Sequence, residues 1–506
     1  MSKVLDDSLT KPILYVVLIL AMFGIVAMLS ASLGKGAVSS AYAYDSLFFF
    51  KRQLAFLVVG LVAMFAIQKW FNMEKYRFLL GMPLTIFTML LLVWALFSSS
   101  VNEVNRWISI GGFHFQPGEL AKISMILFWA DFLAKRQRKL AEAFQPPLMK
   151  SAPGGPMKPR PVPPLFSLRW FMYYGHIVKN TLKALLPAII VTAVVVVLIE
   201  SGRDLGTIIV ISATIFAMVM AAGTPWQFAL GTIGGLGLLG GLMICKEAYR
   251  ANRIHSWLHP LDDKLGDGYQ AYNSFIAISK GGIWGCGMPF SRQKFDFLPE
   301  MHCDFIYPII CEELGLVGSL GLLLLFLILF TCCVGVAVRC KDPYMSMVSF
   351  GISVQIVGQA LFNVAVVTGI LPNKGLPLPF VSAGGSSLML SLMSMGLLLN
   401  ISEHTNVRPK QALPKSTRRK AVRKGATISS SDQQVSVKPV SSREWEAIVA
   451  QGRTPVDHKL PRPVIEPSWS KVVIFEPGSR AERERWRRLH PFIGGRSSNE
   501  GAANNA

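Results

Sequence analysis

The sequence FLPEMHCDF at residues 297–305 leads directly into IYPIICEELGLVGSLGLLLLFLILFT at residues 306–331. The second stretch is apolar and long enough to cross the ~30 Å hydrocarbon core of a bilayer, for which about 20 helical residues suffice. It nevertheless contains Glu312 and Glu313, and an ionised side chain at mid-bilayer costs ~2.5–3.5 kcal/mol or more. We therefore expect both glutamates to face protein or water. We expect Asp304, at the end of the preceding loop, to lie at the boundary between water and lipid.

The chain as a whole is too apolar for an ordinary soluble protein. Of its 506 residues, 51% are hydrophobic and 16% are charged, and the mean hydropathy is +0.42. These values predict an all-α membrane protein with many spans. The formal net charge of +21 does not indicate nucleic-acid binding, because the basic residues gather beside spans and carry no recognisable reader motif. Their positions favour a topology signal and contact with acidic membrane lipid.

About ten apolar stretches are candidate transmembrane helices. A polar loop at residues 246–304 separates the seventh from the eighth, and only residues 200–204 separate the fifth from the sixth. The ten stretches are 13–33, 54–68, 78–97, 120–134, 184–199, 205–222, 227–245, 305–331, 345–368 and 384–401.

Lysine and arginine residues orient these spans. Placing residues 1–12 in the cytoplasm also keeps the basic cluster at 135–139 and the basic tail inside, as the positive-inside rule prefers. The loop 246–304 and three shorter connections then face outward, where they can line one cavity. The shorter connections are 101–118, 200–204 and 372–383.

These boundaries divide the chain into a membrane domain at 13–402 and segments in the cytoplasm. A basic, proline-rich connection at 135–183 contains a predicted flexible linker at 145–164. The tail at 403–506 loses the apolar periodicity and is rich in Ser, Pro, Lys and Arg. We expect it to be mostly disordered.

The outer loop contains a predicted helix and a glycine-rich run. Tyr269, Tyr272 and Phe275 recur at helical spacing, which favours a helix lying on the bilayer surface. The run at 281–287 follows, and its glycines allow a sharp turn or the close approach of a ligand. The seven cysteines predict neither a disulfide framework nor a zinc site. Cys286 and Cys303 can pair only if they face an oxidising compartment.

Charged residues near the span ends form two helical patterns. Asp304 and Glu312 are eight positions apart, so a helix would place them along one face. Glu119 and Lys122, at i and i+3, can neutralise one another at membrane depth. That pair is either part of a polar site or a structural bridge.

A set of motifs in order along roughly residues 13–402 resembles the SEDS family (shape, elongation, division and sporulation) of bacterial peptidoglycan polymerases. The lysine in LPNKG is more similar to the division branch, FtsW, than to the elongation branch, RodA. The motifs are KRQ at 51–53, NRW at 105–107, QPGELAK at 116–122, DLGT at 204–207, GYQ at 268–270, GG at 281–282 with Gly285, QK at 293–294, LPEMHCDF at 298–305, EELG at 312–315, LPNKG at 371–375 and SAGGSS at 382–387.

The resemblance implies a glycosyltransferase that polymerises lipid II, an undecaprenyl-diphosphate-linked saccharide, during septal wall synthesis. It acts at the outer face of the bacterial cytoplasmic (inner) membrane, with both termini in the cytoplasm. Asp304 is the candidate base for the acceptor hydroxyl, and the candidate diphosphate-binding cations are Arg106, Lys122, Lys294 and Lys374. Candidate supporting residues are Glu119, Asp204, Glu300, His302, Glu312 and Ser386.

No closed metal site is evident in the sequence, and no organic cofactor is expected. A divalent cation, Mg²⁺ or Mn²⁺, can share the task of neutralising the diphosphate through oxygen ligands. The implied partners are a class B penicillin-binding protein, which is a transpeptidase, and other division proteins. Two other functions fit the same residues: a lipid II flippase, or a scaffold for the division complex.

Overall fold

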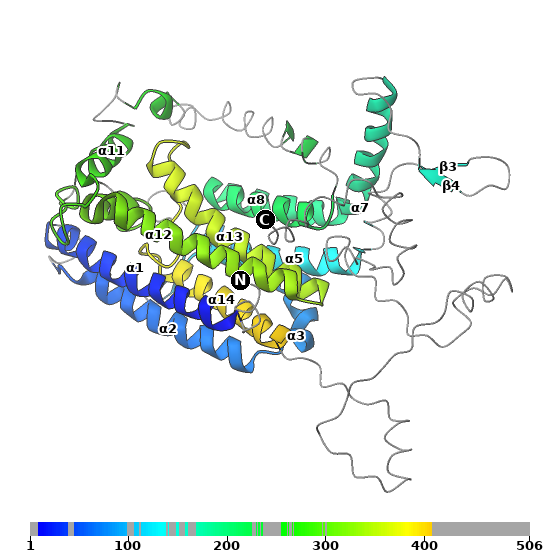
Figure 1. Cartoon of the computed structure of the whole chain (residues 1–506), viewed down its shortest axis with the longest axis horizontal. Helices are drawn as coiled ribbons and strands as arrows, with labels where there is room; N and C mark the ends of the chain where they lie inside the picture. Colours follow the sequence, from blue (N-terminus) through cyan, green and yellow to red (C-terminus); the bar gives the residue numbers. More distant parts are fainter. Residues whose placement is uncertain are drawn as a thin grey trace, which may run out of the picture. The chain divides into compact units, whose positions relative to one another are not determined.

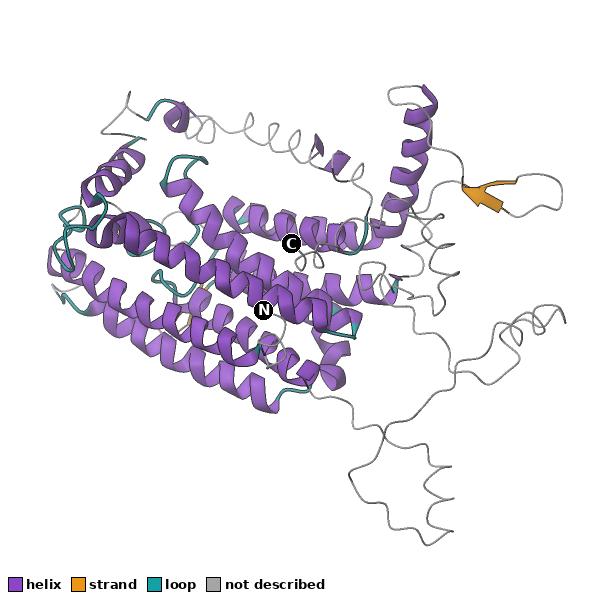
Figure 2. Cartoon of the chain, viewed as in Figure 1, coloured by secondary structure: helices purple, strands orange, loops and turns teal. Residues whose placement is uncertain are grey.

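The computed structural model describes residues 9–38, 45–98, 106–110, 113–137, 140, 148–150, 157–159, 168–224, 229, 231–232, 234–235, 255–260, 262, 266, 268–295, 297–298 and 301–406. Regular structure in this part of the chain is almost entirely helical (Figure 2). The helices are α1 (Thr10–Val38), α2 (Phe48–Trp70), α3 (Met73–Leu80), α4 (Met82–Phe97), α5 (Pro117–Lys135), α7 (Leu168–Ser201), α8 (Leu205–Ala221), α11 (Tyr269–Gly281), α12 (Ile306–Arg339), α13 (Pro343–Val367) and α14 (Gly385–Asn406).

The predicted multi-span helical membrane fold is confirmed. Within the described residues, six helices are long and apolar enough to cross a membrane, or seven if the bent pair α3–α4 counts as one span. The third predicted span is this pair, bent by 47°. The fifth predicted span, 184–199, lies within the candidate span Val178–Ser201 of the longer helix α7. The seventh, 227–245, lies almost wholly outside the described residues, as do residues 407–506 of the predicted tail.

Several of these helices run alongside one another as a bundle (Figure 1). α14 packs along α2, α12 packs along α13, and α5 packs against α4, α8 and α13. At one end of the bundle, the Asn400 amide of α14 donates to the carbonyls of Gln68 and Phe71, both at 2.8 Å. These bonds satisfy carbonyls that the end of α2 leaves open, so α2 and α14 are fixed to one another.

Short strand pairs occur in two connections. β1 (Ile108–Ile110) pairs antiparallel with β2 (Phe113–Phe115) just before α5. β3 (Leu148–Lys150) pairs antiparallel with β4 (Met157–Pro159) inside the predicted linker. The linker prediction therefore missed a hairpin, whose short strands carry too weak a pattern to be read from sequence.

The predicted helix in the outer loop is present as α11, but its packing face is unexpected. Asn273, Ser274 and Ala277 are buried, and the Ser274 hydroxyl donates to the Val367 carbonyl at 2.7 Å. A Cβ on Gly281 would lie 1.9 Å from the Cys311 carbonyl oxygen. Small side chains thus bring α11 into close contact with α12 and α13, while its tyrosine face remains partly exposed.

A break at Gly315 divides α12 into two segments. The φ of 66° and ψ of −164° at Gly315 are not helical. Before the break, every side chain from Ile306 to Glu313 is buried. After it, Leu316, Leu320 and Leu324 are each more than half exposed. The segment after Gly315 spans about 36 Å at ~1.5 Å per residue, so it can cross the hydrocarbon core alone, and Glu312 and Glu313 face protein as expected.

The glycine-rich run at 281–287 binds the backbone groups that this break releases. Loop amides donate to helix carbonyls on one side, and helix amides donate to loop carbonyls on the other. The bonds are Cys286 N to Glu312 O (2.9 Å), Gly287 N to Glu313 O (2.9 Å), Leu316 N to Gly282 O (2.9 Å) and Val317 N to Ile283 O (3.2 Å). An unsatisfied backbone group in lipid costs several kcal/mol, so these bonds make the break tolerable at the edge of a span.

Glycine is required at the two positions where the loop and the helix cross. Gly285 has a φ of 80°, and a Cβ there would lie 2.2 Å from the Glu313 carbonyl oxygen. A Cβ on Gly315 would lie 2.4 Å from the Gly285 nitrogen. No side chain fits between two backbones at this separation.

Gly285→Ala should therefore lower the stability of the folded protein by ~1–3 kcal/mol or more, from the left-handed backbone alone. The measurement is the Tm of the purified full-length protein in detergent. The matched control is Gly321→Ala in α12, where a Cβ would have nothing within 4 Å. We expect the control to keep or raise the Tm, and equal Tm values for the two variants would contradict the proposed fit.

Candidate active site

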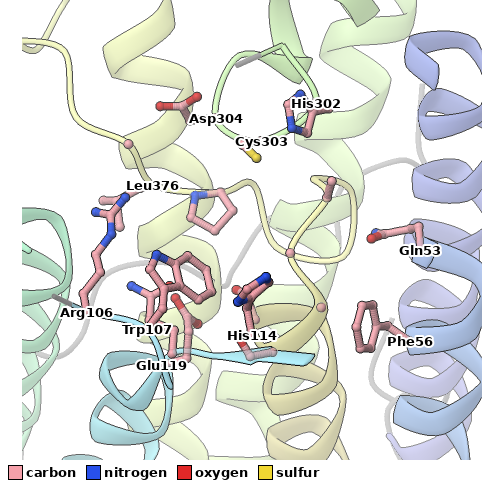
Figure 3. A pocket seen from close by; sticks show the side chains of 18 of the residues that line it. Gln53, Phe56, Arg106, Trp107, His114, Glu119, His302, Cys303, Asp304 and Leu376 are labelled. Carbon is pink, nitrogen blue, oxygen red and sulfur yellow. The ribbon is translucent and has the colours of Figure 1, made fainter. Parts of the chain in front are cut away.

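A cavity of about 490 Å³ opens at the end of the bundle where α2, α5, α8, α12 and α14 begin. Segments far apart in the sequence contribute its walls, and the side chains labelled in Figure 3 surround it. The lining residues are Phe49, Arg52, Gln53, Phe56, Arg106, Trp107, His114, Gln116, Glu119, Asp204, Thr207, His302, Cys303, Asp304, Gly375, Leu376, Pro377, Ala383, Gly384, Gly385, Ser386 and Ser387.

Parts of the cavity lining are suited to bind an anion, whereas Glu119, Asp204 and Asp304 contribute carboxylates. α5, α8 and α14 all begin at its wall, where Gln116, Asp204 and Ser386 line it. The free amides of a helix N-terminus carry about half a positive charge and favour phosphate and carboxylate groups. Arg52 and Arg106 add two guanidinium groups to the lining, and the buried Arg106 Nε has no hydrogen-bond partner among the described residues.

Asp304 lies in the wall of this cavity, held by its backbone. Its carbonyl accepts a hydrogen bond from the Asn363 amide at 2.8 Å, and the same amide donates to the Leu376 carbonyl at 2.7 Å. A Cβ on Gly375 would lie 3.1 Å from Asp304 Oδ2, so the chain at Gly375 passes directly beside the carboxylate. Asp304 is half-buried, and the segment that follows it is buried, so the acid lies at the cavity beside a helix start that faces protein.

A series of buried polar contacts lies behind the cavity wall and connects α5, α13 and the segment at Pro377. Lys122 Nζ lies 2.7 Å from Glu119 Oε2 and donates to Gln359 Oε1 at 2.7 Å. The Gln359 amide then donates to the Pro377 carbonyl at 2.7 Å. Only Glu119 and Pro377 of these residues line the cavity. Lys122 thus lies behind the cavity wall, and Glu119 and Gln359 bind its ammonium group.

Lys294 and Glu312 lie outside the set of lining residues and fasten the outer loop instead. The fully buried Lys294 forms an ion pair with Glu313 Oε1 at 3.1 Å, donates to Ser30 Oγ at 3.2 Å and contacts the Pro289 carbonyl. Glu312 accepts from Ser291 Oγ at 2.5 Å and from two loop amides. The eight-residue spacing therefore does not bring Glu312 to the site of Asp304.

Three more of the predicted site residues line the cavity: Asp204, His302 and Ser386. The His302 ring packs on Phe49, with centroids 4.2 Å apart, and the His302 carbonyl accepts from the Ala383 amide at 2.7 Å. Asp204 caps α8 and accepts from the Gln116 amide at 2.8 Å. Ser386 belongs to the first turn of α14.

The remaining predicted residues do not reach the cavity or are not described. Lys374 immediately precedes Gly375 but does not itself line the cavity. Glu300 lies outside the described residues. Cys286 and Cys303 are both free thiols, so the pairing left open by the sequence is not formed.

The chain matches the sequence profile of the Cell cycle protein family FtsW/RodA/SpoVE over residues 10–407. The chain belongs to this family. Stage V sporulation protein E of Bacillus subtilis (strain 168) is 35% identical over 398 residues, covering 77% of this chain and 96% of that protein. The probable peptidoglycan glycosyltransferase FtsW of Geobacter sp. (strain M18) is 33% identical over 394 residues, covering 77% and 95%.

The fold of this FtsW/RodA/SpoVE protein also matches a solved structure. A chain from "Structural coordination of polymerization and crosslinking by a peptidoglycan synthase complex" has a TM-score of 0.54 and 24% identity, covering 78% of this chain and 98% of that chain. At this identity, the likeness establishes the fold only. It agrees with the helical membrane architecture described above.

Several residues in and around the cavity of this FtsW/RodA/SpoVE protein were not predicted as site residues, although the sequence pattern marks some of them. Arg52 and Gln53 belong to the KRQ motif, which received no role. Gln359 and Asn363 lie within an otherwise apolar span, where a polar amide by itself indicates a buried partner. His114 carried no such signal, because only the β1–β2 hairpin brings it to the cavity.

Removing one partner of the buried pair should strongly destabilise this FtsW/RodA/SpoVE protein. Lys122→Met leaves the buried Glu119 carboxylate uncompensated, for which we expect a loss of ~3–5 kcal/mol. Unfolding of the purified protein measures the effect, and Glu119→Leu/Lys122→Met should recover part of it. Lys51→Met, which removes an exposed ion pair with Asp45, is the control and should hardly change the Tm. A Lys122→Met protein as stable as this control would refute the bridging role.

Proposed function

We propose that this protein is a peptidoglycan glycosyltransferase that polymerises lipid II at the outer face of the bacterial cytoplasmic membrane during cell division. Family membership and the FtsW relative named above support the activity. The structural observation that supports it best is Asp304 in the wall of a polar cavity where several helix N-termini meet. A carboxylate next to an anion-binding surface is the combination that transfer from a diphosphate carrier needs.

In the proposed reaction, the hydroxyl of an acceptor sugar attacks the anomeric carbon of a donor saccharide with inversion. A carbon–oxygen bond forms to the acceptor, and the bond to the diphosphate breaks, so that the diphosphate leaves with the electron pair. Asp304 accepts the proton of the attacking hydroxyl. The departing diphosphate is already a good leaving group and needs no protonation, but its charge must be stabilised.

We propose that Arg106 and Lys374 are the cations near Asp304 that stabilise the charge of the departing diphosphate. Arg106 lines the cavity, and Lys374 adjoins Gly375, whose backbone passes beside the Asp304 carboxylate. Lys122 and Lys294 are engaged in buried ion pairs, so we propose structural roles for them. Glu119, Asp204, His302 and Glu312 likewise hold elements in place around the reacting groups.

A divalent cation is proposed to bind together with the diphosphate rather than in a preformed protein site. The described residues contain no group of three His, Cys, Asp or Glu side chains that could hold a metal ion. Glu119 is paired with Lys122, and Asp204 is bound by Gln116 and Thr207. When bound, Mg²⁺ or Mn²⁺ would neutralise phosphate oxygens that the protein leaves uncovered.

The proposed setting is a division complex at the septum. We propose that both termini lie in the cytoplasm and that a class B penicillin-binding protein crosslinks the strands made here. The solved structure with the same fold comes from a peptidoglycan synthase complex that couples polymerisation to crosslinking, which supports a transpeptidase partner for this chain.

Asp304→Asn should abolish polymerisation of purified lipid II, because the amide cannot accept the hydroxyl proton, while the fold and the Tm are retained. Glycan chain formation on gels measures the activity. Asp45→Asn is the matched control, since Asp45 precedes α2 and does not line the cavity, and it should polymerise normally. Normal polymer from Asp304→Asn, without a contaminating polymerase, would remove Asp304 from the role of base.

Topology can be tested through Cys286, in the glycine-rich run of the outer loop, and Cys340, which directly follows α12. A membrane-impermeant maleimide added to spheroplasts should label the exposed Cys286, whereas Cys340 should react only after permeabilisation. Partial desolvation of the Cys286 thiol, and then the nearby carboxylates of Glu312 and Glu313, raise its pKa above the usual range. Its labelling rate should therefore rise as the pH increases from 7 to 9, because the thiolate is the nucleophile. Labelling of Cys340 in intact spheroplasts would reverse the proposed orientation.

A further inference from the structure

The first turn of α14 forms the wall of the cavity through Gly384, Gly385, Ser386 and Ser387. The first backbone bond of this turn runs from the Leu388 amide to the Gly384 carbonyl at 2.8 Å. The amides that precede Leu388 therefore have no intrahelical acceptor. They are free to bind a ligand that carries several acceptor oxygens.

Two serine hydroxyls accompany these amides. Ser386 is 2% exposed and Ser387 is 7% exposed, yet both line the cavity. Within the described part of the chain, neither side chain takes part in a hydrogen bond. Both hydroxyls are therefore available to a ligand in the cavity, and a bound anion would accept a hydrogen bond from each.

The Phe56 ring lies against the first turn of α14, and the Arg52 guanidinium group lies over the same ring. A Cβ on Gly385 would lie 2.4 Å from this ring, so the backbone of α14 packs directly on it. The Arg52 guanidinium carbon lies 5.8 Å from the centre of the same ring. Arg52 also lines the cavity, which places a cation, free amides and hydroxyls around one corner of it.

The segment that leads into this turn is held in place by its neighbours. The Gln53 amide donates to the Ser382 carbonyl at 3.0 Å, and the Ala383 amide donates to the His302 carbonyl at 2.7 Å. α2, which carries Arg52, is thereby tied to the chain that begins α14. Groups held in position before binding lose little conformational freedom when a ligand arrives.

We propose that the first turn of α14 and Arg52 form a diphosphate-binding subsite. The amides of Gly385, Ser386 and Ser387, with the two serine hydroxyls, bind phosphate oxygens, and Arg52 neutralises their charge. This inference rests on the proposed function, because it identifies which part of the cavity holds the diphosphate of a lipid-linked saccharide. It places that group on the α2–α14 side of the cavity, whereas the expected cations Lys122 and Lys294 do not line the cavity and are paired with Glu119 and Glu313.

Binding is best measured on full-length protein carrying Asp304→Asn, in which turnover is expected to stop. The probes are inorganic pyrophosphate and farnesyl diphosphate, titrated calorimetrically in detergent, and their comparison separates the diphosphate from its lipid. Ser386→Ala/Ser387→Ala should weaken both probes at least tenfold (about 1.4 kcal/mol), and so should Arg52→Gln.

Two matched controls keep the test specific. Ser391→Ala removes a hydroxyl that is 7% exposed on the same helix and does not line the cavity, and Arg292→Gln removes an exposed arginine of the outer loop. Both should bind the probes as Asp304→Asn alone does. If the double serine variant fails to fold, Arg52→Gln decides the question, because Arg52 is exposed and its loss leaves the core intact.

Unchanged affinity in the serine and arginine variants would overturn the subsite. That failure differs from failure of the proposed function, which would appear as normal polymerisation by Asp304→Asn. Weakened farnesyl diphosphate binding with unchanged pyrophosphate binding would also overturn the subsite, since the residues would then recognise the lipid chain.

Discussion

The reciprocal backbone bonds between the glycine-rich run at 281–287 and the break in α12 are the constraint on which the rest depends. A helix that continued unbroken from Ile306 would carry its first turns along the direction of the span. The break at Gly315 frees those turns to lie within protein, where every side chain up to Glu313 is buried. Because the loop binds both sides of the break, it also fixes the position of Asp304, which immediately precedes this buried segment.

Around Asp304, some charged side chains line the cavity, and others form buried ion pairs that hold the structure together. Arg106 and Asp304 line the cavity, whereas the ammonium groups of Lys122 and Lys294 are neutralised by buried glutamates. A buried charge left without a partner is strongly unfavourable, so lysines at these depths must be paired. The positive groups in the cavity lining are therefore helix N-termini and the arginines Arg52 and Arg106, whose charge does not depend on a proton that can be lost near neutral pH.

Much of the fold could be predicted from local pattern. Hydropathy located the described spans, and helical spacing identified α11. The same patterns concealed the break in α12, because Gly315 lies in a continuous apolar run and its partner loop is distant in sequence. Asp304 was predicted to be the acid of the site, and it lies in the cavity wall. The partners of Lys294, in contrast, include Ser30, which is 264 positions away. Such pairings depend on tertiary packing, which one sequence does not reveal.

One amide in α13 has a mechanical consequence. Asn363 donates to the carbonyls of both Asp304 and Leu376, which belong to different walls of the cavity. Together with the bond from the Ala383 amide to the His302 carbonyl, this amide joins the 302–304 segment to the 375–387 segment of the cavity lining. A tilt of α13 would therefore move the backbone at Asp304 and at Leu376 together, so the reacting carboxylate would keep its position relative to the chain at Gly375.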